Sequence, residues 1–158
     1  MRASNEGLQA IVDSEGIVLN PYDDGAGFLT IGVGHKLTVE ETFSGVVFID
    51  GGPVPWKDGF SWDQAIALLE QDAGRAEAVV NELVEVELTQ GQFDALVSFV
   101  FNVGQGNFKR STLLRVLNEG DYEEVPNQLN RWVYAGRPKK VMRGLVVRRT
   151  REIRLWNS

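Results

Sequence analysis

The segment TQGQFDALVSFVFNVG, residues 89–104, constrains the fold more than any other part of the chain. It opens with Thr89 and Gln92, which form a helix-capping signature, and it closes with Gly104, a typical helix stop. The predicted helix between them is apolar on every face. Because such a helix is normally buried, we expect it to form the centre of a helical lobe.

Helical periodicity predicts five further helices. They cover about residues 4–15, 61–81, 111–118, 122–133 and 141–156. Gly16 follows the first of them at a C-terminal cap position, and Gly120 ends the helix that begins near residue 111. Ser61 and Gln64 form a second capping box, which marks the start of a long helix.

The stretch between the first two helices has a different character. Short apolar runs in GIVLNPYDDGAGFLTIGVG are divided by turn residues, which predicts a hairpin or meander with Asp24 on a turn and Thr30 on the second strand. Residues 42–60 hold prolines and glycines among β-branched residues, so we expect a hairpin or long ordered loop there and no helix. The expected fold class is therefore α+β.

At 158 residues, 43% of them hydrophobic, the chain is long enough for one core. We expect a single domain over residues 1–158, in which a β lobe at about 14–60 and a helical part made of 1–13 and 61–158 leave a cleft between them. Neither a long apolar run nor a signal-like start occurs, so we expect a soluble protein made in the cytoplasm, without stable membrane insertion. The sequence has no cysteine and one histidine, which excludes thiolate and multi-histidine metal sites, and no cofactor is expected.

Charge is unevenly distributed along the chain. Residues 1–108 hold 4 Lys or Arg against 17 Asp or Glu, a net −13, whereas residues 109–158 hold 12 against 5, a net +7. Two interpretations stay open: the basic part faces a polyanion such as nucleic acid or a wall polymer, or the two parts attract each other within one fold.

Two carboxylates and a threonine lie close together near the start of the chain. Glu15 is flanked by apolar residues that would desolvate it and raise its pKa, whereas Asp24 lies among glycines and should stay ionised. This difference is what glycosidic hydrolysis requires of its acid and its second carboxylate, and the Thr30 hydroxyl could hold a water against Asp24. On spacing alone, acids near glycines are more often simple turn residues. His35 is by the same standard more often a packed residue than a base, and Asp72 on the long helix is a candidate partner for it.

The stretch EGIVLNPYDDGAGFLTIGVGH resembles the signature of phage-type lysozymes, the endolysins related to the T-even phage lysozyme. That signature runs Glu, eight residues, Asp, five residues, Thr, then Ile-Gly-x-Gly-His, and every position is matched. Further similarity lies in LTQGQFDALVSFVFNVG, STLLRVLNEGDY, NRWVYAG and RGLVVRRTREIRLW, so only residues 39–61 fall outside it. The resemblance implies a muramidase that cleaves the β-1,4 bond between N-acetylmuramic acid and N-acetylglucosamine in peptidoglycan.

The resemblance also implies a role for individual residues. Glu15 would be the general acid, Asp24 would activate or stabilise across the sugar ring, and Thr30 would help to place the attacking water. His35 and Asp72 would form a structural ion pair between the lobes. Phe101 and Asn102 would line the cleft, and Lys36 would approach the sugar. One cation, either Lys140, Arg143 or Arg148, would lie beside the acid.

The chain departs from the family pattern after His35, because related endolysins pass quickly to the long helix. Here about 20 residues, TFSGVVFIDGGPVPWKDGFSW, intervene. This insertion either contacts substrate or a partner, or is a tolerated surface loop. Trp56 and Trp62 are likewise either sugar-stacking surfaces or core residues.

Several properties follow only as expectations. Thr30 as a water-placing group favours inversion, for which the two carboxyls should lie roughly 6.5–9.5 Å apart rather than about 5–5.5 Å. We expect a monomer that acts on the wall in the periplasm, reached through a holin, with virion-borne entry as the other route. Two alternatives differ in function: a wall-binding or nucleic-acid-binding module built on residues 109–158, and an enzyme acting on chitin-like polymers.

Overall fold

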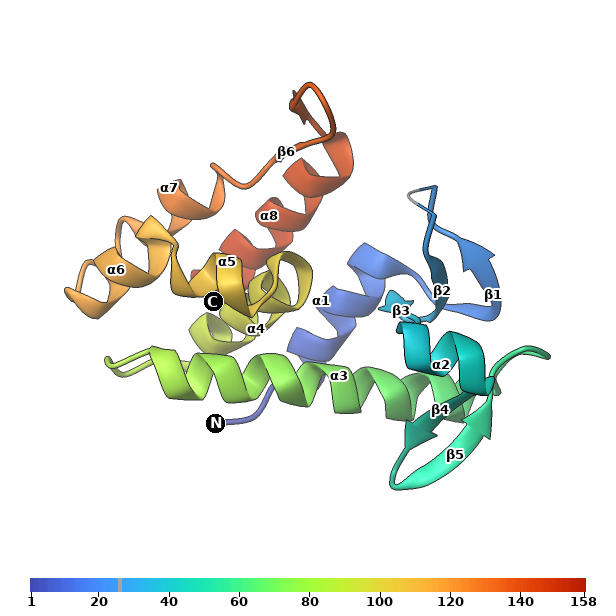
Figure 1. Ribbon diagram of the computed structural model, residues 1–158. Helices are drawn as coiled ribbons and strands as arrows, with labels where there is room; N and C mark the ends of the chain where they lie inside the picture. Colours follow the sequence, from blue (N-terminus) through green and yellow to red (C-terminus); the bar gives the residue numbers. More distant parts are fainter. Residues whose placement is uncertain (26) are drawn as a thin grey trace. The chain divides into compact units, whose positions relative to one another are not determined.

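The computed structural model describes residues 1–25 and 27–158. The helices are α1 Asn5–Glu15, α2 Val39–Ser44, α3 Trp62–Leu83, α4 Gln90–Val103, α5 Gln105–Lys109, α6 Thr112–Asn118, α7 Val125–Leu129 and α8 Arg143–Trp156 (Figure 1). The strands are β1 Val18–Asp23, β2 Leu29–Gly32, β3 His35–Lys36, β4 Val46–Ile49, β5 Gly52–Pro55, β6 Tyr134–Ala135 and β7 Lys140–Val141. None of the helices within these described residues is both long and apolar enough to cross a membrane.

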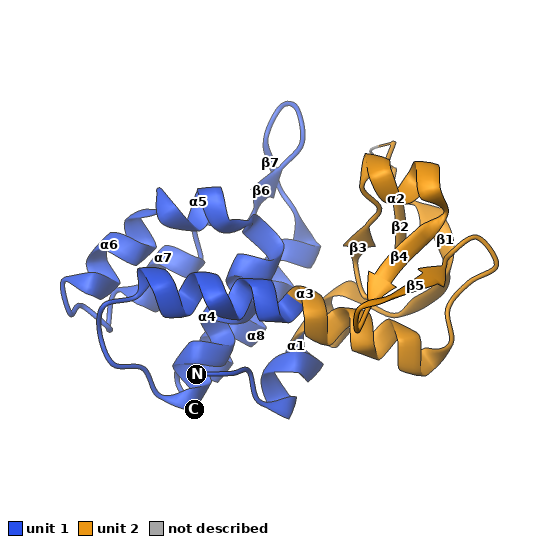
Figure 2. Ribbon diagram, turned by 60° about the horizontal axis from the view of Figure 1, so that its bottom comes forward, with its two compact units in different colours: residues 1–10, 73–158 blue, residues 11–72 orange. Residues whose placement is uncertain are grey.

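The chain divides into two compact units, coloured separately in Figure 2. The helical unit comprises residues 1–10 and 73–158, and the sheet unit comprises residues 11–72. The divisions fall within α1 and α3, so each of these helices contributes residues to both units.

In the helical unit, α4 is buried along most of its length, from Phe93 to Val100. It packs mainly against α8, and the Phe99 ring meets Phe108 and Trp132 edge-on, at centroid distances of 6.2 and 5.3 Å. Thr89 forms the predicted capping box. The sequence-based prediction of a buried central helix is therefore confirmed.

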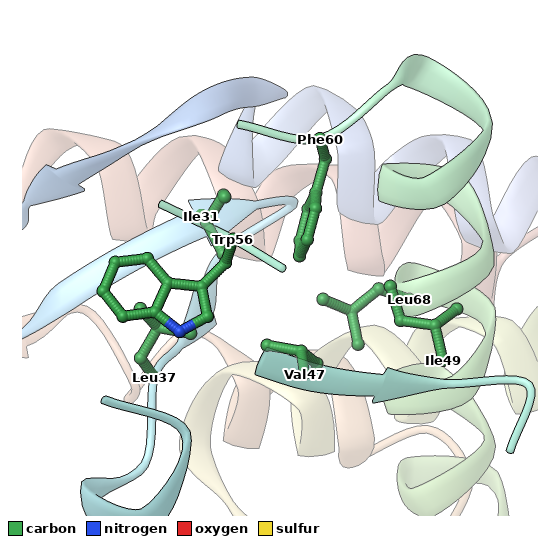
Figure 3. Packing of buried hydrophobic residues seen from close by; sticks show 7 residues of the cluster. All are labelled: Ile31, Leu37, Val47, Ile49, Trp56, Phe60 and Leu68. Carbon is green, nitrogen blue, oxygen red and sulfur yellow. The ribbon is translucent and has the colours of Figure 1, made fainter. Parts of the chain in front are cut away.

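The sheet unit contains an antiparallel meander, β1–β2–β3, and a separate hairpin, β4–β5. Asp50 and Gly51 connect the hairpin with φ of 53° and 80°, as a tight turn that follows the twist of its strands requires. Seven side chains, coming from the meander, the hairpin, the segment after it and α3, form the core in Figure 3: Ile31, Leu37, Val47, Ile49, Trp56, Phe60 and Leu68. The predicted meander and hairpin are confirmed, and Trp56 is a core residue, whereas Trp62 is exposed.

One prediction in the sheet unit is wrong: residues 42–44 belong to helix α2 rather than to a non-helical segment. Thr38 and Glu41 form a complete capping box, and Gly45 ends the helix at a φ of 75°. The T-x-x-E signal was present in the sequence, but a helix of six residues is too short to show periodicity.

The helical unit also differs from expectation near the C-terminus. The helix predicted at 122–133 is only α7, with a proline in its first turn, and α5 was not predicted. The last helix begins at Arg143 rather than near 141, because Lys140 and Val141 pair with Tyr134 and Ala135 as β7 and β6. Strands of two residues carry no alternation that a sequence pattern could reveal.

Candidate active site

One row of side chains crosses the meander. Thr30 on β2 is the register partner of Tyr22 on β1 and of Lys36 on β3. Because directly paired residues in antiparallel strands point to the same face, all three side chains lie on one face of the sheet. Asp24, two residues after Tyr22, continues this face, since its Oδ2 lies 3.6 Å from Lys36 Nζ.

Glu15 reaches this region from the end of α1. Gly16 ends the helix at a φ of 73°, and the carboxylate packs against Gly34 in the turn between β2 and β3. A Cβ at Gly34 would lie 2.7 Å from Glu15 Oε2, and φ there is 65°. Any other residue at this position would displace the carboxylate and strain the turn, which explains the second glycine of the IGVGH motif.

The Thr30 side chain is buried, with 3% of its surface exposed. Its Oγ1 has no hydrogen-bond partner among the residues that the structure describes. A buried hydroxyl that stays unpaired costs about 1–3 kcal/mol. Thr30 Oγ1 is therefore suited to bind a small polar group from outside the chain.

Tyr22 is a site residue that the sequence reasoning missed. Burial raises the pKa of its hydroxyl above the ordinary value of 10, and the charges of Glu15 and then Asp24 raise it further. The phenol thus lies within electrostatic reach of both carboxylates and stays protonated at neutral pH. Its position two residues before Asp24, on the same strand face, was the signal available in the sequence.

Lys36 was predicted to approach the sugar, and in the structure its ammonium group lies beside Asp24. Nζ is also 5.6 Å from the centre of the exposed Phe28 ring. The ammonium group thus forms an ion pair with Asp24, at 3.6 Å from Oδ2, on the exposed side of the sheet unit.

His35 lies between two carboxylates in the sheet unit. Its Nδ1 is 2.7 Å from Asp72 Oδ2, which is the predicted partner, and its Nε2 is 3.0 Å from Glu41 Oε2, which sequence reasoning missed. Burial alone would lower the pKa of His35, but the hydrogen bonds and charges of Asp72 and Glu41 outweigh it and hold the pKa above 6.5.

The helical unit holds a second group of polar residues, buried between α4 and α8. Arg149 donates from Nη2 to Asn102 Oδ1 at 2.7 Å, and its Nε lies 2.8 Å from Glu152 Oε2. Glu152 Oε1 accepts from Ser98 at 2.8 Å and lies 3.5 Å from Arg148 Nε. Burial raises the pKa of Glu152 and lowers that of Arg149 to about 10, so the guanidinium stays charged at neutral pH.

These contacts bear on the predicted cleft residues and cations. Asn102 is held in place by Arg149, and Phe101 beside it is half-buried. Of the three candidate cations, Arg148 is buried next to Glu152, whereas Lys140 and Arg143 are exposed. Sequence reasoning missed Arg149 and Glu152 because charged residues on a helix normally face water.

Asn102 also lines a hollow of about 900 Å³ within the helical unit. Trp132 and Tyr134 contribute aromatic surface to it, and Arg131 and Lys139 contribute positive charge. Aromatic faces combined with a few polar groups are typical of small-molecule and carbohydrate sites.

Comparison with known proteins decides the family. The sequence profile described as Phage lysozyme matches residues 12–152. The chain belongs to the phage lysozyme family. The SAR-endolysin of Escherichia phage Mu is 38% identical to it over 149 residues, which cover 94% of this chain and 77% of the relative. The endolysin of Salmonella phage P22 is 35% identical over 158 residues, which cover 100% of this chain and 99% of the relative.

Solved structures agree with this assignment. The muramidase domain of SpmX from Asticaccaulis excentricus matches with a TM-score of 0.83 and 32% identity, covering 99% of this chain and 98% of that one. A P22 lysozyme mutant matches with a TM-score of 0.80 and 34% identity, covering 100% and 99%. The predicted lysozyme-like α+β fold is confirmed, and this member of the phage lysozyme family is a lysozyme-type glycoside hydrolase of the endolysin class.

Within this phage lysozyme family fold, the sheet unit brings Glu15, Asp24 and Thr30 into one neighbourhood and adds Tyr22 and Lys36. The arrangement offers an acid at a helix end, a carboxylate beside a cation and a buried hydroxyl. Each group has its own environment, which is the condition for two carboxyls to carry out different proton chemistry.

Proposed function

We propose that this lysozyme cleaves the β-1,4 bond between N-acetylmuramic acid and N-acetylglucosamine with Glu15 as general acid and Asp24 as the ionised partner. Glu15 protonates the leaving oxygen, and Asp24 draws a proton from the attacking water. The buried, unpartnered hydroxyl of Thr30 carries this proposal, because a water bound there would satisfy the hydroxyl and lie on the sheet face that holds Asp24.

The neighbouring side chains support this division of roles. Lys36 forms an ion pair with Asp24, with 3.6 Å between Nζ and Oδ2, beside the carboxyl to which we assign the base. Tyr22, protonated at neutral pH, supplies a hydrogen-bond donor within electrostatic reach of both carboxyls. Phe101, Asn102 and the hollow beside them are the surface we assign to the glycan in the helical unit.

A water placed by Thr30 implies inversion of the anomeric centre. Proton NMR of the first-formed product from purified peptidoglycan tests this. The α anomer is expected, and an initial excess of the β anomer would mean that Asp24 acts as a nucleophile instead. Loss of activity in both Glu15→Gln and Asp24→Asn, with unchanged circular dichroism, would establish that the two carboxyls work together.

We also propose a cellular setting for this endolysin. We infer that the enzyme is made in the host cytoplasm, acts as a monomer, reaches the wall through a holin and requires neither nucleic acid nor a cofactor. The endolysin names of the relatives support a peptidoglycan substrate. Expression with and without a co-expressed holin tests the route, because lysis is expected only in its presence.

A further inference from the structure

The two candidate catalytic carboxyls contact residues only two positions apart, one in the turn before β3 and one in β3 itself. Gly34 packs directly against the Glu15 carboxylate, and Lys36 lies 3.6 Å from Asp24. His35 stands between these two contact residues. Whatever fixes His35 therefore fixes the surroundings of both carboxyls.

His35 is fixed at both ring nitrogens. Asp72 of α3 lies 2.7 Å from Nδ1 and Glu41 of α2 lies 3.0 Å from Nε2. A carboxylate accepts but does not donate, so while Asp72 and Glu41 are both ionised, the two contacts require a proton on each nitrogen, which makes the ring an imidazolium. With 8% of its surface exposed, the ring has few other partners available.

Glu41 is itself firmly placed, and it directly precedes the insertion, which begins at Thr42. Its Oε2 also accepts from the Thr38 backbone at 3.0 Å as part of the capping box, and its backbone oxygen accepts from Trp56 Nε1 at 2.8 Å. The Trp56 ring is one of the core residues in Figure 3. At the far end of the insertion, Phe60 N donates to Leu19 O of β1 at 2.8 Å, so both ends are tied to the meander.

We propose that Glu41 is a positioning residue of the reaction, and that the insertion acts on catalysis by fixing Glu41, which holds His35 against Asp72 and thereby seats Glu15 and Asp24. This inference rests on the proposed function of those two carboxyls. It gives the insertion a role that needs no contact with substrate, because the chain from Gly34 to Lys36 passes the constraint to the site.

The proposal predicts in which direction the contribution of His35 to stability changes with pH. The charged groups that face His35 are Asp72 from α3 and Glu41 from α2; Glu15 lies beyond Gly34, and Lys36 is next along the strand. The folded pKa of His35 is raised above its ordinary value of 6.5, so its contribution to stability is complete below about 6.5 and is lost as pH rises through the folded value. Removing the Glu41 charge moves that loss to lower pH.

Glu41→Gln is the decisive variant, with Glu40→Gln as its matched control. Glutamine also serves as the third residue of a capping box, so α2 is retained, and Glu40 is an exposed acid on the same helix. Because His35 is the only histidine, its ring protons give one unambiguous NMR titration. The second measurement is kcat and KM on purified peptidoglycan across pH.

We expect Glu41→Gln to lower the pKa of His35, to shift the alkaline loss of kcat to lower pH in parallel, and to reduce kcat by about tenfold with little change in KM. Glu40→Gln should match the wild type in all three. A Glu41→Gln variant whose His35 pKa falls while kcat and its pH profile stay unchanged would overturn the inference and leave the lysozyme activity standing. The activity itself would fail separately, if the wild type released no fragments.

Discussion

At the scale of single residues, the site depends on two positions where a side chain is missing or unpaired. Gly34 leaves room for the Glu15 carboxylate, and Thr30 presents a buried hydroxyl that no described residue bonds. A fold optimised only for stability would place a side chain at position 34 and give the Thr30 hydroxyl a hydrogen-bond partner. Both features are instead suited to binding a water and a sugar next to two carboxyls.

Replacing Thr30 by valine separates catalysis from stability. The methyl groups keep the packing, and the hydroxyl that is lost has no protein partner to leave unsatisfied. We expect kcat to fall roughly 10²-fold, while the free energy of unfolding changes by less than about 1 kcal/mol. Thr30→Ser is the matched control: it should retain more activity than valine and lose about 1 kcal/mol of stability with its buried methyl. An active Thr30→Val enzyme would remove Thr30 from the mechanism.

Tyr22→Phe tests the residue that the structure added to the site. The ring stays in place, and only the hydroxyl, which lies within electrostatic reach of Glu15 and Asp24, is removed. We expect kcat to fall about tenfold, since one hydrogen-bond donor is lost near the reacting atoms. Tyr122→Phe is the control, because Tyr122 donates to the Glu87 carbonyl at 2.8 Å in the other unit and should affect stability alone. Equal kcat values in the two variants would contradict a role for Tyr22.

The candidate catalytic positions were recognisable in the sequence because their spacing matches a family signature, whereas the contacts around them were not. Glu15, Asp24 and Thr30 lie within one stretch of 16 residues. Glu41 contacts His35 from a helix that is too short to recognise, and Arg149 contacts Asn102 across 47 positions of sequence. Contacts of that separation are set by packing, which no local pattern records.

At the scale of elements, capping signals predicted helices better than periodicity did. The boxes at Ser61 and Thr89 marked the starts of α3 and α4, and the same pattern at Thr38 marked α2, where β-branched and glycine-rich surroundings outweighed it. The β6–β7 hairpin turns at Gly136, with a φ of 88°, between strands of two residues. Such short elements are fixed by their pairing rather than by local preference.

The buried charges between α4 and α8 make a prediction at this scale. Glu152→Gln leaves the guanidiniums of Arg148 and Arg149 without their carboxylate in the interior, which should cost about 3–5 kcal/mol in the free energy of unfolding. The control is Glu119→Gln, which breaks the exposed pair with Arg115 and should cost at most about 1 kcal/mol. Urea denaturation of both variants checks this, and equal midpoints would contradict it.

At the scale of the whole molecule, the uneven charge is partly structural. Arg148 and Arg149 belong to the basic C-terminal third of the chain, yet they are buried inside the helical unit, where the Glu152 carboxylate pairs with both and offsets one of their two charges. Other basic residues of this part of the chain, among them Arg131, Lys139 and Lys140, are exposed on or near β6 and β7. The predicted cleft between the two parts of the fold stays a prediction, and the chemistry we propose rests on groups of the sheet unit.

Mass spectrometry of the fragments released from purified peptidoglycan by the wild type and by Glu15→Gln tests the central claim most directly. The amide has nearly the shape of the acid but has no acidic proton to donate to the leaving oxygen. We expect muropeptides with reducing N-acetylmuramic acid ends from the wild type and none from the variant. Anhydro-muramic ends would show a transglycosylase, and reducing ends from both proteins would show that Glu15 is not the acid.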